Sequence, residues 1–295
     1  MLTAQAALLI LMVTNTLLMV YLRNTVEVKS SSFYISLITL VGCYFVCISS
    51  ALYAAYSSFY ISNTKVFTAL CYMDLWLSIN GLDLVIVPLL FRLLRIVHVF
   101  GSFRTTGKFW SDKFLVLYIS LLCFVIVFLL FIWNATNPLR YTLDVTYIRP
   151  RNHSPYYREY AYCTSDLFGL WTLLTYCWLG LLLVVILLFA IKTRHIKRKN
   201  YKDTKKVNAF VFSVSAVLMT FIPLSFILVA VDVLVGAFIF KWLAFFMVPL
   251  LCQVFIFMPK IYPGLLSSRR KKKPSVSALA RMALSVSLPT TSTTL

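Results

Sequence analysis

The chain has 295 residues, of which 61% are hydrophobic and 13% are charged, and its formal net charge is +19. A soluble globular domain is nearer half apolar with about a quarter of its residues charged, so this composition excludes an ordinary soluble protein and indicates a membrane protein. The seven cysteines include no pair with zinc-ligand spacing, and no hydrolase or nucleotide-binding motif stands at a credible place. The sequence therefore predicts no enzyme, no metal site and no cofactor.

Seven apolar segments are long enough to cross a membrane, which takes about 20 mostly apolar residues. They lie at residues 3–22, 33–55, 66–91, 114–133, 167–191, 208–231 and 237–258. The first has no basic residue before its apolar core and no clear cleavage site, so we interpret it as a helix rather than a signal peptide. The predicted fold class is an all-α membrane protein, a seven-transmembrane helix bundle. The third and fifth segments exceed a bare span, which predicts tilt or extension into water.

The distribution of Lys and Arg predicts how the bundle is oriented. Most of these residues fall in the loops near 23–32, 92–113 and 192–207 and in the tail from 259. With seven spans, these four regions share one side of the membrane, and the basic side is expected to be cytoplasmic. The N-terminus is then outside and the C-terminus inside.

The loop at 134–165 falls on the expected outer side. Asn134 and Asn152 each begin a glycosylation sequon there, although Asn134 is close to the membrane and a proline follows the second sequon. Cys71 and Cys163 lie at the edges of spans on this side, where a disulfide would survive, and two free thiols are the alternative. The loop has Tyr-, Thr- and Val-rich flanks around a centre with Pro and Asn, which predicts a short β-hairpin.

Two polar residues inside the third segment, Asn80 and Asp83, are three positions apart and so share one helix face. Polar side chains are costly in lipid, and two interpretations stay open: a pocket or ion site in the bundle interior, or a hydrogen-bonded structural role. Lys241 and Lys260 lie near the two ends of the last segment rather than at mid-depth, which argues against a retinal-type photoreceptor.

Three of the segments contain an internal proline, and we expect kinks at Pro88, Pro223 and Pro249. A transporter would often show inverted repeats and broken helices. The two halves of this sequence show no convincing similarity to each other, so a seven-span transporter or channel is the least favoured alternative.

Four stretches at the expected cytoplasmic ends of the helices carry a further signal. They are VKSSSFYISLITLVG at 28–42, FRLLRIVHVF at 91–100, FAIKTRHIKRKNYKDTKKVNAF at 189–210 and FMPKIY at 257–262. In this order and on these helices, they resemble the seven-helix domain of class C G-protein-coupled receptors, the metabotropic glutamate and GABA-B group. Arg92 and Arg95 stand where the family has Lys-x-x-Arg, Asp203 and Lys205 resemble the Asp-Ser-Lys of GABA-B-type subunits, and Lys260 matches the Lys of Phe-x-Pro-Lys-x-Tyr.

The resemblance implies a plasma-membrane receptor that couples an extracellular or intrabundle signal to a heterotrimeric G protein. It also implies a homo- or heterodimer with another class C subunit, and a non-signalling subunit of the same fold is the alternative. In this family an acidic residue at the start of helix 6 pairs with a basic residue at the end of helix 3. The expected ionic lock is therefore Asp203–Arg92, with hydroxyl partners from Ser30, Ser31 and Ser32. Alternatively, Asp203 only relieves repulsion in its loop or caps its helix.

The sequence departs from the family in two respects. Some relatives carry a Trp five residues before the proline of helix 6, whereas this chain has Leu218 there, with Phe221 as the candidate for a related role in an intrabundle pocket. Relatives usually carry a large extracellular ligand-binding module before helix 1, and about two residues precede it here. Three explanations stay open: a truncated gene model, a ligand that enters the bundle, or a partner subunit that holds the ligand module.

The predicted receptor domain spans residues 1–262, and a basic, then Ser/Thr-rich tail at 263–295 is expected to be disordered and cytoplasmic. We expect the tail's basic run to bind anionic lipid of the inner leaflet. No nucleic-acid partner is expected. The run consists of Arg269, Arg270, Lys271, Lys272 and Lys273.

Overall fold

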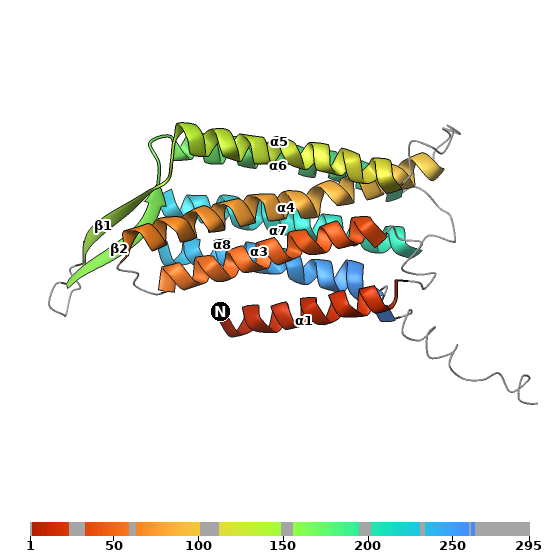
Figure 1. The fold of residues 1–295 in the computed structure, drawn as a ribbon, viewed down its shortest axis with the longest axis horizontal. Coiled ribbons are helices and arrows are strands. Elements are labelled where there is room, and N and C mark those ends of the chain that lie inside the picture. Colours follow the sequence, from red (N-terminus) through yellow and green to blue (C-terminus); the bar gives the residue numbers. More distant parts are fainter. Residues whose placement is uncertain are drawn as a thin grey trace, which may run out of the picture.

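The fold is a bundle of seven long helices with a two-stranded hairpin at one end (Figure 1). A computed structural model describes residues 2–23, 33–58, 63–100, 112–148, 156–194, 202–230, 234–259 and 261–262. The helices are α1 (Leu2–Tyr21), α3 (Phe33–Ser58), α4 (Thr64–Phe100), α5 (Asp112–Thr136), α6 (Phe168–Arg194), α7 (Lys202–Ala230) and α8 (Leu234–Cys252). The predicted seven-helix bundle is confirmed, since all seven helices are long and apolar enough to cross a membrane. The tail at 263–295, with its basic run, lies outside the described residues.

The long apolar runs become helices because a helix satisfies every backbone hydrogen bond internally, as a span in lipid requires. Helix α4 has 37 residues. At about 1.5 Å per residue it is far longer than the hydrocarbon core of about 30 Å. Its extension beyond a bare span was predicted from the sequence, and it gives α4 a residue at every depth of the bundle.

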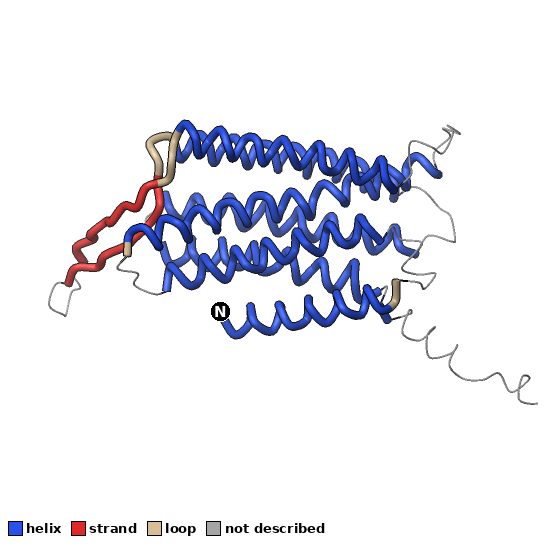
Figure 2. Tube along the Cα trace, in the orientation of Figure 1, coloured by secondary structure: helices blue, strands red, loops and turns tan. Residues whose placement is uncertain are grey.

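The predicted hairpin is present and defines one end of the molecule. Strand β1 (Arg140–Ile148) pairs antiparallel with β2 (Tyr156–Thr164), in a register that places Tyr141 opposite Cys163. Figure 2 shows the two strands projecting from the end at which α3 stops and α4 starts. We call this the hairpin end, and the end at which α4 stops and α7 starts the opposite end.

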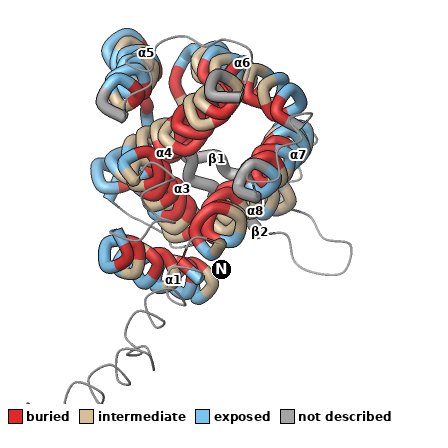
Figure 3. Tube along the Cα trace, turned by 90° about the vertical axis from the view of Figure 1, so that its right-hand side faces the viewer, coloured by how far each residue is buried: buried red, intermediate tan, exposed pale blue. Residues whose placement is uncertain are grey.

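The buried faces of the helices point toward one another, and their exposed faces point outward (Figure 3). Helix α4 packs against α3, α5 and α6, whereas α1 and α5 lie at the periphery. The outer face of α5 is apolar, with Leu121, Phe124, Phe128 and Phe131 all exposed. An apolar exterior of this kind suits a bundle surrounded by lipid chains.

Helices α3 and α4 approach closely because each contributes a glycine. A Cβ atom at Gly42 would lie 2.8 Å from the backbone carbon of Leu84 and 2.9 Å from the carbonyl oxygen of Gly81. A Cβ atom at Gly81 would lie 2.8 Å from the backbone nitrogen of Val46. Small residues at such a crossing are typical of membrane helices, since close backbones gain van der Waals contact.

Pro88, Pro223 and Pro249 lie inside α4, α7 and α8. Proline cannot donate a backbone hydrogen bond, so each releases a carbonyl group of the preceding turn. Helix α8 continues as the π-helical turn η1 (Gln253–Phe257), and the Met258 N–H donates to the carbonyl oxygen of Gln253, five residues earlier. Single π-helical turns of this kind often accompany functional sites.

Candidate functional site

A disulfide ties the hairpin to the first turns of α4. Cys71 of α4 is bonded to Cys163 of β2, with 6.4 Å between the Cα atoms, which confirms the expected pairing. The Leu139 N–H donates to the Tyr72 hydroxyl group at 2.7 Å, just before β1. The ring of Phe67 packs edge-on against Tyr141. The hairpin is thus held to α4 by one covalent and two non-covalent contacts within about two helical turns.

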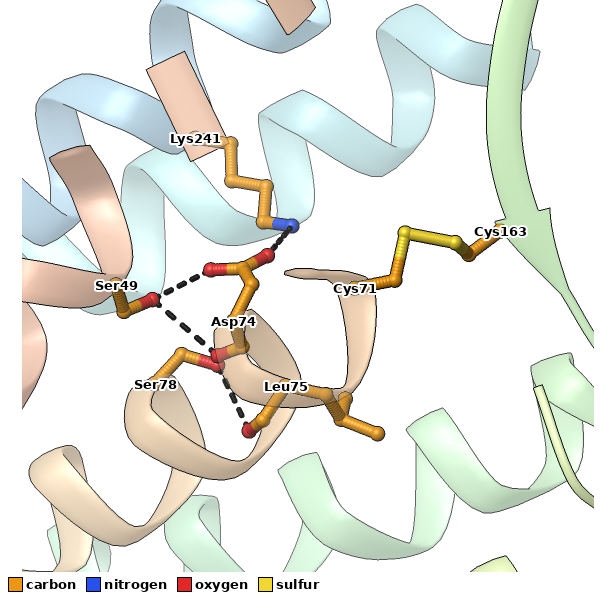
Figure 4. Close-up of polar contacts among 7 residues, drawn as sticks. All are labelled: Ser49, Cys71, Asp74, Leu75, Ser78, Cys163 and Lys241. Atoms are coloured by element: carbon orange, nitrogen blue, oxygen red, sulfur yellow. Dashed lines mark hydrogen bonds and ion pairs between the residues drawn. A yellow bond between two sulfur atoms is a disulfide. The ribbon is translucent and has the colours of Figure 1, made fainter. Parts of the chain in front are cut away.

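One helical turn beyond the disulfide, Asp74 joins three helices. Its side chain is buried, with 5% of the residue exposed. The Ser49 hydroxyl group of α3 donates to Asp74 Oδ1 at 2.6 Å, and Lys241 Nζ of α8 lies 3.8 Å from Oδ2 (Figure 4). A buried carboxylate needs such partners, because an unpaired charge costs several kcal/mol.

Lys241 has a second neighbour, which is aromatic. Its Nζ atom lies 4.0 Å from the centroid of the Tyr53 ring, and that ring stacks on Phe238 at 5.1 Å. A cation over an aromatic face is stabilised by about 0.5 to 2 kcal/mol, more where water is excluded. We call Ser49, Tyr53, Asp74 and Lys241 the hairpin-end polar cluster.

Sequence reasoning did not identify this cluster. Lys241 was noted only for its depth, and Asp74 was not singled out. A signal was present, since each is an ionisable residue inside an apolar segment, and such residues usually pair with each other. Only the packing of α3 against both α4 and α8 shows that these two are the partners.

Four residues were expected to line an intrabundle pocket, and each contacts a different set of neighbours. They are Asn80, Asp83, Leu218 and Phe221. Asp83 is fully buried, and the Trp178 indole donates to its Oδ1 at 3.3 Å. Asn80 donates to the carbonyl oxygen of Trp76, one turn earlier on its own helix, at 2.8 Å. Thus Asn80 bonds within α4, whereas Asp83 bonds across to α6.

The other two pocket candidates lie on α7. Leu218 is buried in the main hydrophobic core, and the ring of Phe221 packs against Phe240 of α8 at 5.7 Å. The Cys123 thiol of α5 also lies beside the Asp83 carboxylate. A pocket formed by the four residues stays a prediction.

The expected G-protein face lies at the opposite end of the bundle. Arg92 and Arg95 are half-buried on α4, and Lys205 is exposed on α7. The backbone of Asp203 belongs to the first turn of α7, but its side chain lies outside the described residues, as do Ser30, Ser31, Ser32 and Lys260. The Asp203–Arg92 lock therefore stays a prediction, with both of its helices reaching the same end.

A hydrogen-bonded clamp joins α6 to α7 near this face. Thr193 Oγ1 donates to Asn208 Oδ1 at 3.1 Å, and Asn208 Nδ2 donates to the Ala190 carbonyl oxygen at 3.2 Å. Both side chains are buried. The clamp orients the first turns of α7, which carry Asp203 and Lys205. Both of its residues lie within the stretch 189–210, but the sequence did not reveal that they meet.

Several side-chain hydrogen bonds fix the peripheral helix α1, and two of them join buried amide groups to its neighbours. Asn15 Nδ2 donates to Gln253 Oε1 at 2.7 Å, and Gln5 Nε2 donates to Ser50 Oγ at 2.6 Å. Gln253 is fully buried and lies at the start of η1. Interhelical polar pairs supply specificity where lipid offers no hydrophobic driving force between helices.

Neither glycosylation sequon is tested by these contacts. Asn134 lies in the last turns of α5, with a buried Oδ1 atom that has no hydrogen-bond partner among the described residues. Asn152 lies outside the described residues. Glycosylation stays a prediction, and for Asn134 it requires exposure of a partly buried carboxamide group.

Comparison with known proteins matches residues 1–260 to the family described as "7 transmembrane sweet-taste receptor of 3 GCPR". Gamma-aminobutyric acid type B receptor subunit 2 of Caenorhabditis elegans is 24% identical over 152 residues, which cover 52% of this chain and 18% of that protein. The subunit 2 of Homo sapiens is 22% identical over 211 residues, which cover 70% of this chain and 22% of that protein. The chain thus matches about a fifth of the length of these relatives.

Proposed function

Because the chain belongs to the class C family of seven-transmembrane G-protein-coupled receptors, we propose that its helix bundle couples a signal at the hairpin end to a heterotrimeric G protein at the opposite end. The chain is a multi-pass protein of the plasma membrane. The observation that carries the proposal is the family match over nearly the whole bundle, from the first helix through η1. The disulfide between α4 and the hairpin agrees with an extracellular hairpin end.

The opposite end has the charge that a cytoplasmic face requires. Basic residues concentrate in the connections at this end, as the positive-inside rule predicts for the cytoplasmic side. In our proposal, Arg92 of α4 forms an ion pair with Asp203 of α7 in the resting state. This ion pair breaks when a G protein binds. The clamp between Thr193 and Asn208 supports this arrangement, since it fixes the turns of α7 around Asp203.

We further propose that the chain works as a dimer with another class C subunit. The relatives are named as subunits of a receptor, and the chain corresponds to about a fifth of each. A subunit that contributes the fold but does not itself activate a G protein is the second candidate, on the same observation. The partner would then supply the surface that activates the G protein.

Nucleotide exchange on purified Gα subunits tests the coupling proposal. The full chain in lipid nanodiscs is mixed with Gα and Gβγ of several classes, alone and with a second class C subunit. We expect exchange to accelerate with at least one Gα class. Acceleration only with the second subunit would favour the non-signalling alternative, whereas an ion-selective current from the same protein in a planar bilayer would contradict a receptor.

A further inference from the structure

We propose that the Asp74–Lys241 pair is a latch that transmits movement of the β-hairpin to the first half of α8. The latch is a property of the bundle itself. Only its effect on signalling rests on the proposed function, and both experiments below work without a G protein.

The Asp74–Lys241 pair stabilises the resting arrangement of α4 and α8, because it joins the two helices through a buried charge. Asp74 on α4 is 5% exposed and Lys241 is the cation facing it from α8. Removal of either partner leaves a charge without its counterion in a setting where charges are costly. The resting contact between these turns of α4 and α8 therefore depends on both residues.

The pair is also built to open. The separation of 3.8 Å exceeds the roughly 2.7 to 2.9 Å of a charge-assisted hydrogen bond. Lys241 keeps 32% of its side-chain surface exposed and already has the Tyr53 ring as a second neighbour. Asp74 keeps the Ser49 hydroxyl group when the lysine leaves. Both ions thus retain a partner in the open state, which lowers the free-energy cost of opening.

The disulfide connects this latch to the hairpin. Cys71 precedes Asp74 by three residues, so the two lie on one face of α4, one turn apart (Figure 4). Cys163 lies within β2 and Tyr72 receives the hydrogen bond from Leu139. A force on the hairpin therefore acts on the turn of α4 that carries Asp74, and the latch passes it to α8.

The first experiment measures coupling within the pair by thermal unfolding of the full chain in detergent. The buried thiols of Cys43, Cys47 and Cys252 report unfolding through a thiol-reactive dye. Four variants are compared with Lys65→Met, which removes an exposed lysine at the same end. The variants are Asp74→Asn, Lys241→Met, the double variant Asp74→Asn/Lys241→Met, and the charge swap Asp74→Lys/Lys241→Asp.

We expect each single substitution to lower the melting temperature by about 3 to 8 °C and Lys65→Met to leave it unchanged. The melting temperature of the double variant should be no lower than that of the less stable single variant. The charge swap should restore part of the lost melting temperature. Two results together would contradict an interaction between Asp74 and Lys241. The falls in melting temperature of the two single variants would add in the double variant, and the charge swap would melt no higher than the double variant. If the charge variants do not fold, Tyr53→Phe and Tyr53→Leu serve instead, and the fall in melting temperature should be larger for leucine, which removes the ring facing Lys241.

The second experiment tests transmission by hydrogen exchange of the same full chain. Asp74→Asn should accelerate exchange about tenfold in the first turns of α8 and leave η1 unchanged. Loss of the disulfide in Cys71→Ala/Cys163→Ala should accelerate the same turns of α8, although both cysteines are remote from it in sequence. Adding Asp74→Asn to that variant should cause little further change. If loss of the disulfide accelerated hydrogen exchange only in the two strands and at the start of α4, the proposed transmission to α8 would be wrong.

Discussion

Thr193 at the end of α6 and Asn208 at the start of α7 form a buried hydrogen bond of 3.1 Å, and Asn208 also donates to the Ala190 carbonyl group. Asn208→Ala leaves that carbonyl group and the threonine without this partner. We expect the free energy of unfolding to fall by about 1 to 2 kcal/mol. Thermal unfolding in detergent measures this. Thr220→Ala is the control, since Thr220 is exposed and donates to carbonyl groups of its own helix. An equal effect of both variants would contradict the clamp.

The close crossing of α3 and α4 predicts that added volume is not tolerated there. Gly81→Ala places a methyl group 2.8 Å from backbone of the facing helix, so we expect a loss of about 1 to 3 kcal/mol or poor surface expression. Gly180→Ala in α6 adds the same group where nothing lies within 4 Å, and it should be neutral or slightly stabilising. Equal melting temperatures for the two variants would contradict the packing.

The pair that ties α1 to η1 predicts an asymmetry between single and double substitutions. Asn15→Leu leaves the fully buried Gln253 without its partner, and we expect a loss of about 1 to 2 kcal/mol. Asn15→Leu/Gln253→Leu removes both polar groups and should be more stable than Asn15→Leu alone. The comparison uses thermal unfolding of both variants. If the double variant is the less stable of the two, the hydrogen bond is not the reason for the loss.

Because of the disulfide, we expect substitution of Cys71 or Cys163 to lower the melting temperature strongly, and substitution of the free Cys177 to leave it unchanged. The bond closes a sequence separation of 92 residues, and a loop near 100 residues corresponds to about 4 to 5 kcal/mol in the chain-entropy account. Cys163→Ser should lower the melting temperature as much as Cys71→Ser or the double variant. Cys177→Ser replaces an exposed free thiol and should behave as the wild type. Additive losses from the two cysteines would contradict the bond.

Sequence predicted the elements of this fold far better than the contacts between them. The spans, the long third helix and the hairpin follow from apolar length and from strand-forming flanks around a turn, all of which are local properties. Cys71 and Cys163 could be paired because both were expected on one side of the membrane.

The contacts depend on how each helix is rotated against its neighbours, which periodicity specifies poorly when nearly every residue is apolar. Asp74 and Lys241 are 167 positions apart, and the packing of α3 against both α4 and α8 brings them together. For the same reason, Asn80 and Asp83 were placed correctly on one face of α4, but their different partners could not be foreseen.

In our proposal, this chain activates a G protein through its opposite end, and Asp203 restrains that activation. The most direct measurement is basal activation in cells by energy transfer between tagged Gα and Gβγ, comparing the wild type with Asp203→Ala at matched surface expression. Lys205→Ala, which changes an exposed charge on the same helix, is the control. Our account predicts a higher basal signal in Asp203→Ala than in the wild type or the control. A background-level signal in all three proteins, across several Gα classes, would contradict it.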